Sequence, residues 1–182
     1  MADRPVRRSI RLRGLDYRSP GAYVITVCSF HRACLFGEIV RDQLQPNSIG
    51  EIVKEVWRAI PTFFPHLDLD AYVVMPNHVH GILILKEGPR AKHPPEADAS
   101  PLHRRRPKGT QRGSISAIVQ TFKAATTRGV HSLPGMKGLR LWQRGLYDHI
   151  IRNDAELNRV RRYIEENPLR WALDEENPQP SV

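Results

Sequence analysis

The chain has few cysteines and no long apolar run. Its two cysteines, Cys28 and Cys34, do not form the CxxC pair that marks many zinc and redox sites. A low number of cysteines is typical of proteins in a reducing compartment. No apolar run approaches the length that spans a bilayer, and the first residues lack the pattern of a secretory leader. We therefore expect a cytoplasmic protein, free of the membrane, that works in the cytosol or at the nucleoid.

Acidic residues are scarce relative to basic ones. The sequence holds 19 Asp and Glu against 28 Lys and Arg, which gives a formal net charge of +9. Lys and Arg gain affinity for nucleic acids by releasing the counterions condensed on phosphate. A nucleic-acid partner is therefore one interpretation of the charge, and a merely solvated basic surface is the other.

The length predicts a single domain, residues 1–182, because a chain of this size buries one hydrophobic core. Two segments are expected to lie outside that core. One is a basic N-terminal arm at 1–14, and the other is a flexible, basic, Pro-rich loop at 86–113.

Apolar spacing predicts an α+β fold, with an antiparallel sheet and helices on one of its faces. Pro76 and Asn77 separate two of the strands, and the sequence leaves open whether they form a hairpin or one kinked strand. The predicted strands are 22–28, 67–75, 79–85 and 147–151, with a strand-like piece at 139–142, and the predicted helices follow Ser48, Ser114 and Asn153.

Two groups of residues could carry chemistry. His78 and His80 stand two apart, so on a strand both imidazoles point to the same face, which suits two metal ligands as well as two ordinary histidines. Tyr163 and Asn167 are four apart on the last helix and emerge on the same side. A tyrosine with a pKa near 10 needs help to act as a nucleophile, and a metal can provide it by polarising a phosphate. The alternative is that Tyr163 packs its ring at the rim of the core and exposes its hydroxyl to water.

Tyr147 is the rival nucleophile, because it stands beside Asp148 and His149. On a strand, however, it alternates away from Asp148, and it has no helical partner equivalent to Asn167. We therefore assign the role to Tyr163.

Four blocks of the sequence are more specific than either group alone. They are 73–80 (Val-Val-Met-Pro-Asn-His-Val-His), 141–144 (Leu-Trp-Gln-Arg), 149–153 (His-Ile-Ile-Arg-Asn) and 163–168 (Tyr-Ile-Glu-Glu-Asn-Pro). Together they closely resemble the REP-associated tyrosine transposases, a family of single-tyrosine HUH transposases. The resemblance runs from about Leu12 to Asn177 with the blocks in family order.

The resemblance implies an RRM-like or ferredoxin-like fold, with the HUH motif on a central strand and the catalytic tyrosine on a facing C-terminal helix. It implies that His78 and His80 bind a divalent metal, Mg²⁺ or alternatively Mn²⁺, with Asn167 as the third ligand. Tyr163 would cleave single-stranded DNA near a hairpin through a 5′-phosphotyrosine and leave a free 3′-OH. A homodimer is a further expectation, and no small-molecule cofactor is expected.

DNA contacts are assigned by charge and ring chemistry. Trp142 is a candidate for stacking on an unpaired base. The candidates for phosphate contacts are Arg11, Arg13, Arg104, Arg105, Arg106, Lys123, Arg144 and Arg152.

Two other functions compete with strand transfer. One is a non-catalytic hairpin-binding or regulatory relative of a transposase, against which the presence of all four proposed site residues counts. The other is a small zinc hydrolase with His66 or His149 as its third ligand. The sequence has no HExxH helix and no cysteine-rich ligand set, which disfavours that hydrolase.

Overall fold

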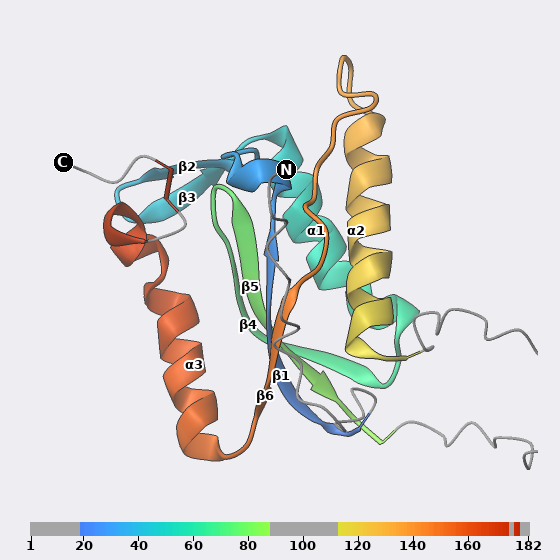
Figure 1. The fold of residues 1–182 in the computed structure, drawn as a ribbon, viewed down its shortest axis with the longest axis vertical. Helices are drawn as coiled ribbons and strands as arrows, with labels where there is room; N and C mark the ends of the chain where they lie inside the picture. Colours follow the sequence, from blue (N-terminus) through green and yellow to red (C-terminus); the bar gives the residue numbers. More distant parts are fainter. Residues whose placement is uncertain (1–18, 88–112, 175–176, 179–182) are drawn as a thin grey trace, which may run out of the picture.

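A four-stranded antiparallel sheet forms the centre of the protein (Figure 1). It is seen in a computed structural model that describes residues 19–87, 113–174 and 177–178. The predicted arm at 1–14 and nearly all of the predicted loop at 86–113 lie outside these residues. The strand order is β4-β5-β1-β6. The strands are β1 (Gly21–Cys28), β4 (Leu67–Val74), β5 (His78–Leu85) and β6 (Tyr147–Ile151).

Helices and a small hairpin complete the described chain. Within it, no helix is long and apolar enough to cross a bilayer. The elements are α1 (Ser48–Phe63), α2 (Ile115–His131), α3 (Asp154–Glu166), the 3-10 segments η1 (Phe30–Arg32) and η2 (Pro168–Leu173), and the paired strands β2 (Gly37–Val40) and β3 (Gln43–Pro46).

The helices lie on both faces of the sheet, which corrects the prediction that they share one face. Figure 1 shows α1 and α2 on one side of the sheet and α3 on the other. The strands are apolar on both faces: Ile25 and Leu83 are buried in the cluster that includes α1 and α2, whereas Val24 and Ile82 pack in the cluster of α3. Each apolar face needs a helical layer to cover it. The α+β class and the antiparallel sheet are confirmed.

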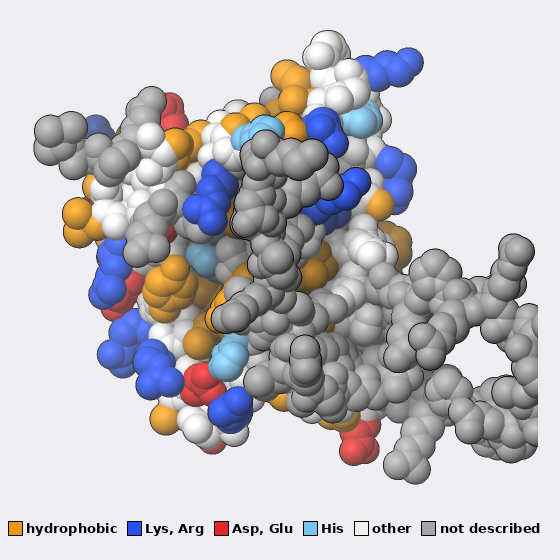
Figure 2. All heavy atoms as spheres, viewed as in Figure 1, with side chains coloured by type: hydrophobic (Ala, Val, Ile, Leu, Met, Phe, Trp, Pro, Cys, Tyr) orange, Lys and Arg blue, Asp and Glu red, His pale blue; other side chains and the backbone are white. Residues whose placement is uncertain are grey.

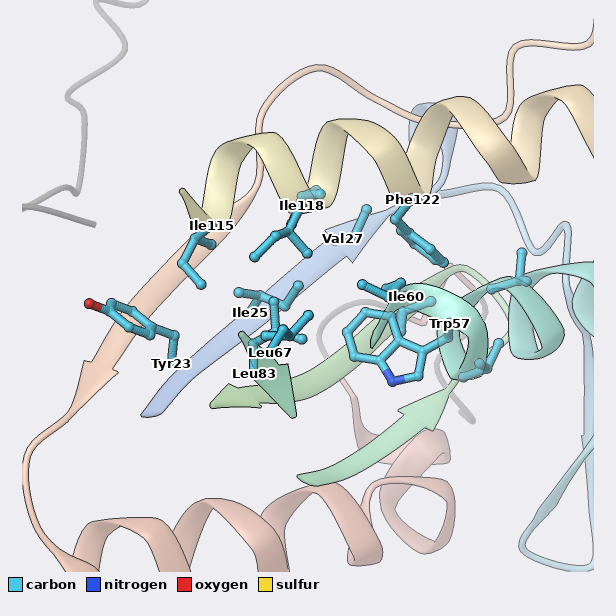
Figure 3. Close-up of a cluster of buried hydrophobic side chains, with 14 of the residues drawn as sticks. Tyr23, Ile25, Val27, Trp57, Ile60, Leu67, Leu83, Ile115, Ile118 and Phe122 are labelled. Carbon is cyan, nitrogen blue, oxygen red and sulfur yellow. The ribbon is translucent and has the colours of Figure 1, made fainter. Parts of the chain in front are cut away.

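The larger core fills the space between the sheet and the layer of α1 and α2 (Figure 3). Trp57 of α1 is fully buried at its centre. Its ring stacks on Tyr72, with centroids 5.8 Å apart, and meets the edge of Phe122 at 5.3 Å. The indole lies so close to β5 that a Cβ atom at Gly81 would be 2.7 Å from Trp57 Cη2 and closer still to Cζ2.

Gly81→Ala should therefore destabilise the protein by about 1–3 kcal/mol, because the new methyl group overpacks the core against the Trp57 ring. Urea unfolding measures the loss. The double variant Gly81→Ala with Trp57→Leu should lose less than the sum of the two single variants, because the smaller side chain makes room for the methyl group. Additive losses would contradict a steric clash at this position.

The connection between β4 and β5 is a hairpin, one of the two arrangements that the sequence leaves open. Met75 N donates to the carbonyl oxygen of His78 over 2.8 Å, which closes the turn. Ser29 N, just after β1, donates to the carbonyl oxygen of Asn77 over 2.8 Å. The turn thereby holds the first residues of β5 against the end of β1.

Candidate functional site

Two histidines begin β5, an inner strand of the sheet. His78 pairs with Cys28 of β1, and His80 pairs with Thr26. Because alternate residues of a strand share a face, both imidazoles lie on the face that α3 covers. Their ring centroids are 4.4 Å apart. Both residues are buried, His78 completely and His80 to 7% exposure.

Each imidazole is anchored through its Nδ1 atom. Asn77 Nδ2 donates to a backbone carbonyl, and its Oδ1 accepts from His78 Nδ1 over 2.7 Å. His80 Nδ1 lies 2.8 Å from Thr26 Oγ1. A proton on each Nδ1 leaves the lone pair on Nε2, the arrangement that fixes metal-binding histidines in their sites.

Burial keeps both imidazoles neutral near pH 7. It lowers the pKa of His78 to about 4, with a further contribution from the positive charge of Arg32. The pKa of His80 falls to about 3, first through burial and then through its neighbour His78. A neutral imidazole is the form that binds a metal ion.

Tyr163 reaches this pair from α3. Its ring and that of His80 have centroids 5.4 Å apart, and the Tyr163 hydroxyl lies 3.5 Å from His80 Nε2. The Tyr163 side chain is 46% exposed. Its hydroxyl thus lies beside His80 Nε2, while nearly half of the side chain is exposed to solvent.

Asn167 completes the site from the C-cap of α3. It is only 2% exposed. Its Oδ1 atom and His78 Nε2 are both buried without a hydrogen-bond partner among the described residues. Asn167 nevertheless lies close enough to His78 to raise the pKa of that imidazole, against the lowering by burial and by the charge of Arg32. Two acceptors that face each other in a buried site repel unless a proton or a cation lies between them.

The donor atoms fit a divalent cation. His78 Nε2, His80 Nε2 and Asn167 Oδ1 offer two neutral imidazoles and one amide oxygen, a set that binds several divalent metals. Among the described residues, no group of three or more His, Cys, Asp or Glu could hold a metal. A metal at this site would therefore need the amide oxygen as its third protein ligand.

An ion pair links α3 to β4. Arg161 Nε donates to Asp70 Oδ1 over 2.9 Å, and its Nη2 donates to Oδ2 over 2.6 Å. Asp70 lies at an irregularity in the register of β4 and β5. Because Arg161 precedes Tyr163 by two residues, the pair locates the helix turn that carries the tyrosine.

Asp70→Asn should lower the free energy of unfolding by about 1 kcal/mol near pH 7, since the bidentate pair is partly exposed. Arg161 holds the pKa of Asp70 below its usual value. The stabilisation is therefore complete above the unfolded pKa near 4 and is lost as the pH falls through the lowered folded pKa. Urea unfolding of both proteins from neutral to acidic pH should show the difference shrinking in acid. A difference that is constant with pH would contradict this assignment.

Lys123, one of the candidates for a DNA contact, is held by backbone groups of the protein. Its Nζ donates to the carbonyl oxygens of Gln143 over 2.9 Å and Gly145 over 2.6 Å. Burial lowers the pKa of Lys123 to about 8. The ammonium group thus links α2 to the 143–145 loop, and its contact with DNA stays a prediction.

Trp142, the candidate for stacking on a base, is half-buried against the larger core. Its ring packs between Phe36 and Phe122, with centroids 5.1 and 5.3 Å away. Its Nε1 donates to Thr126 Oγ1 over 2.8 Å. These contacts anchor the ring to the core, and its stacking on a base stays a prediction.

The other proposed DNA contacts remain predictions. Arg144, which precedes β6 in the sequence, and Arg152, which follows it, are both exposed. The rest, Arg11, Arg13, Arg104, Arg105 and Arg106, lie outside the described residues.

The zinc-hydrolase alternative needs His66 or His149 as a third ligand, and both residues lie away from the pair of His78 and His80. His66 precedes β4 at the end opposite to His80, and its Nε2 lies 3.4 Å from the Gly113 carbonyl oxygen. His149 is on β6, beyond β1, and its Nε2 lies 3.0 Å from Glu156 Oε1.

Sequence reasoning missed the residues that orient the site. Asn77 adjoins His78 in the motif, and this adjacency is a usable signal. Thr26 stands opposite His80 only through the register of β1 and β5. Asp70 and Arg161 are 91 positions apart. No local pattern links such distant partners.

Comparisons with known proteins place the chain in a family and a fold. No family model matches it. An uncharacterized protein of Haemophilus influenzae is 40% identical over 171 residues, which cover 93% of this chain and 92% of that protein. The chain belongs to one family with this Haemophilus protein.

Two solved structures are similar to it. One is a REP-associated tyrosine transposase bound to a REP hairpin, with a TM-score of 0.54, 19% identity and coverage of 93% of this chain and 74% of that one. The other is a putative transposase from Deinococcus radiodurans, with a TM-score of 0.45, 21% identity and coverage of 87% and 97%. The chain shares the fold of the REP-associated tyrosine transposase, the family that its sequence blocks resemble.

Proposed function

We propose that the protein is a metal-dependent transposase that cleaves and transfers single-stranded DNA at hairpin sequences. The observation that carries this proposal is the buried pair of unpartnered acceptors, His78 Nε2 and Asn167 Oδ1, together with a tyrosine hydroxyl 3.5 Å from His80 Nε2. A nucleophile beside a metal-binding set can attack a phosphodiester that the metal polarises.

His78, His80 and Asn167 would hold Mg²⁺ or Mn²⁺. The bound ion would supply charge to polarise a phosphate oxygen. The three protein ligands carry no negative charge of their own, so they leave an anionic phosphodiester free to approach. Asn77 and Thr26 keep the two Nε2 lone pairs directed into the site.

Tyr163 provides the nucleophile. Its phenol loses a proton to solvent as its oxygen forms a bond to phosphorus, and the bond from phosphorus to the 3′ oxygen breaks. The leaving 3′ oxygen takes up a proton and becomes a free 3′-OH, while the 5′ phosphate stays on Tyr163. Attack of another 3′-OH on this phosphotyrosine completes strand transfer and restores the phenol.

The proposed partner is hairpin DNA. The protein of the REP-associated transposase structure is bound to such a hairpin. On this chain, Lys and Arg side chains gather over α3 and across the neighbouring surface, where acidic side chains are fewer (Figure 2). Such a surface attracts a phosphate backbone. Action on chromosomal DNA would place the protein in the cytoplasm at the nucleoid, and a homodimer stays a prediction.

Incubation with labelled hairpin DNA carrying single-stranded flanks tests the function. We expect a band of slower mobility on a denaturing gel in the presence of Mg²⁺ or Mn²⁺ and none in EDTA. Sequencing the attached DNA identifies the target. If hairpins bind tightly but no band forms with either metal, the non-catalytic hairpin-binding alternative replaces strand transfer.

A further inference from the structure

Arg32 lies in η1, between β1 and β2, with its backbone in the left-handed region. Its φ is 55°, and the φ of His31 before it is also 55°. Residues other than Gly, Asn and Asp rarely adopt this conformation because Cβ crowds the carbonyl oxygen. Strained residues of this kind cluster at functional sites, where the surrounding structure holds them in place.

Hydrogen bonds tie this strained segment to the histidine site. Asn77 Nδ2 donates to the carbonyl oxygen of Arg32 over 3.0 Å, and Oδ1 of the same amide accepts from His78 Nδ1 over 2.7 Å. Ser29 Oγ donates to the carbonyl oxygen of Ala33 over 2.7 Å, which closes the loop around Arg32. One amide side chain thus fixes both the His78 ring and the Arg32 backbone.

The charge of Arg32 acts at the same place. Its side chain is exposed to solvent, and its backbone is linked to the His78 ring through the single amide of Asn77. A cation fixed beside neutral ligands has no role in holding a metal ion, but it stabilises an anion that enters the site.

We propose that Arg32 binds the scissile phosphodiester at the edge of the histidine site and stabilises the charge that develops on it as Tyr163 attacks. This inference rests on the function proposed above. The planar guanidinium matches phosphate because it can donate two parallel hydrogen bonds to its oxygens. The hydrogen bond from Asn77 to the Arg32 carbonyl oxygen holds this residue beside the start of β5.

Two variants and a matched control separate this role from a structural one. Arg41, in the turn between β2 and β3, also has a left-handed backbone with φ 50°. We expect Arg32→Gln and Arg32→Asn to slow cleavage about ten- to hundredfold, whereas Arg41→Gln cleaves at the wild-type rate. Arg32→Asn should unfold at the same or a higher temperature than wild type, because Asn tolerates the left-handed region. Slow cleavage by a stable variant excludes a folding defect.

A substrate with a methylphosphonate at the mapped cleavage position tests the contact itself. This substrate has no charge at the reacting phosphorus, so the wild-type protein and Arg32→Gln should cleave it at nearly equal rates. An unchanged penalty on the neutral substrate, or a wild-type rate for Arg32→Gln on the ordinary one, would overturn the proposal.

Failure of the proposed function can be distinguished from failure of this inference. If the wild-type protein forms no covalent band, binding of a short oligothymidylate with Mg²⁺ is measured in the Tyr163→Phe background. Weaker binding on adding Arg32→Gln than on adding Arg41→Gln would retain the phosphate contact without the chemistry. Equal binding would remove the contact as well.

Discussion

DNA should stay covalently attached to the wild-type protein and to Tyr147→Phe, whereas Tyr163→Phe should lose the attachment by about a thousandfold or more. Both tyrosines lie on the same face of the sheet, because Thr26 pairs with His80 on one side and with Tyr147 on the other. Their exposure is nearly the same, 45% for Tyr147 and 46% for Tyr163. The two variants are therefore matched in exposure and in the sheet face that the tyrosines share, and they differ in distance from the histidines.

That distance decides between them. Strand β1 lies between β5 and β6, so the Cα atoms of Tyr147 and His80 are about 10 Å apart. The Tyr163 hydroxyl, in contrast, is 3.5 Å from His80 Nε2. Covalent attachment is read on a denaturing gel with Mg²⁺. Attachment that is lost in Tyr147→Phe and kept in Tyr163→Phe would move the nucleophile to β6, and attachment kept in both would exclude a single essential tyrosine.

The sequence predicted the elements whose signals are local. Each of the four sheet strands was predicted within a few residues, because β-branched and apolar runs mark them. The start of α3 was also correct: Asn153 Oδ1 accepts from Glu156 N over 2.8 Å. At α1 the predicted cap was wrong by one residue, since Asn47 accepts from Ile49 N and Gly50 N while Ser48 is already helical. Neighbouring polar residues compete for this position.

The hairpin of β2 and β3 had no usable local signal. Its two-residue turn has a left-handed backbone at Arg41 and Asp42, with φ of 50° and 61°. Asn-Gly or Asp-Gly usually marks such turns, and this sequence has neither there. The strand-like piece at 139–142 forms only an isolated bridge, Trp142 to Ser29, because Trp142 is drawn into the core between Phe36 and Phe122.

The site was predictable only where its residues are close in sequence. Spacing placed His78 and His80 on one face, and Tyr163 and Asn167 on one side of a helix. Bringing these two pairs together depends on α3 crossing the sheet face opposite to α1 and α2, which is a tertiary arrangement. Sequence resemblance indicated that arrangement.

Metal binding should stabilise the wild-type protein and fail to stabilise Asn167→Leu. A ligand at a hundredfold excess over its Kd adds about 2.7 kcal/mol to the free energy of unfolding, so thermal unfolding with and without Mg²⁺ or Mn²⁺ measures binding without any activity. Asn167→Leu removes the amide oxygen and should abolish most of this shift. Asn158→Ala, at an exposed position of the same helix, should retain the full shift.

In EDTA the order should reverse, with Asn167→Leu more stable than wild type by about 1 kcal/mol. Asn167 Oδ1 is buried opposite His78 Nε2 without a hydrogen bond, and an unsatisfied buried acceptor is unfavourable unless a cation fills the gap. Leucine has a similar size and no acceptor, so it removes that penalty. A variant that is less stable than wild type in EDTA, or that keeps the metal-dependent shift, would show that Asn167 has a structural role and is not the third ligand.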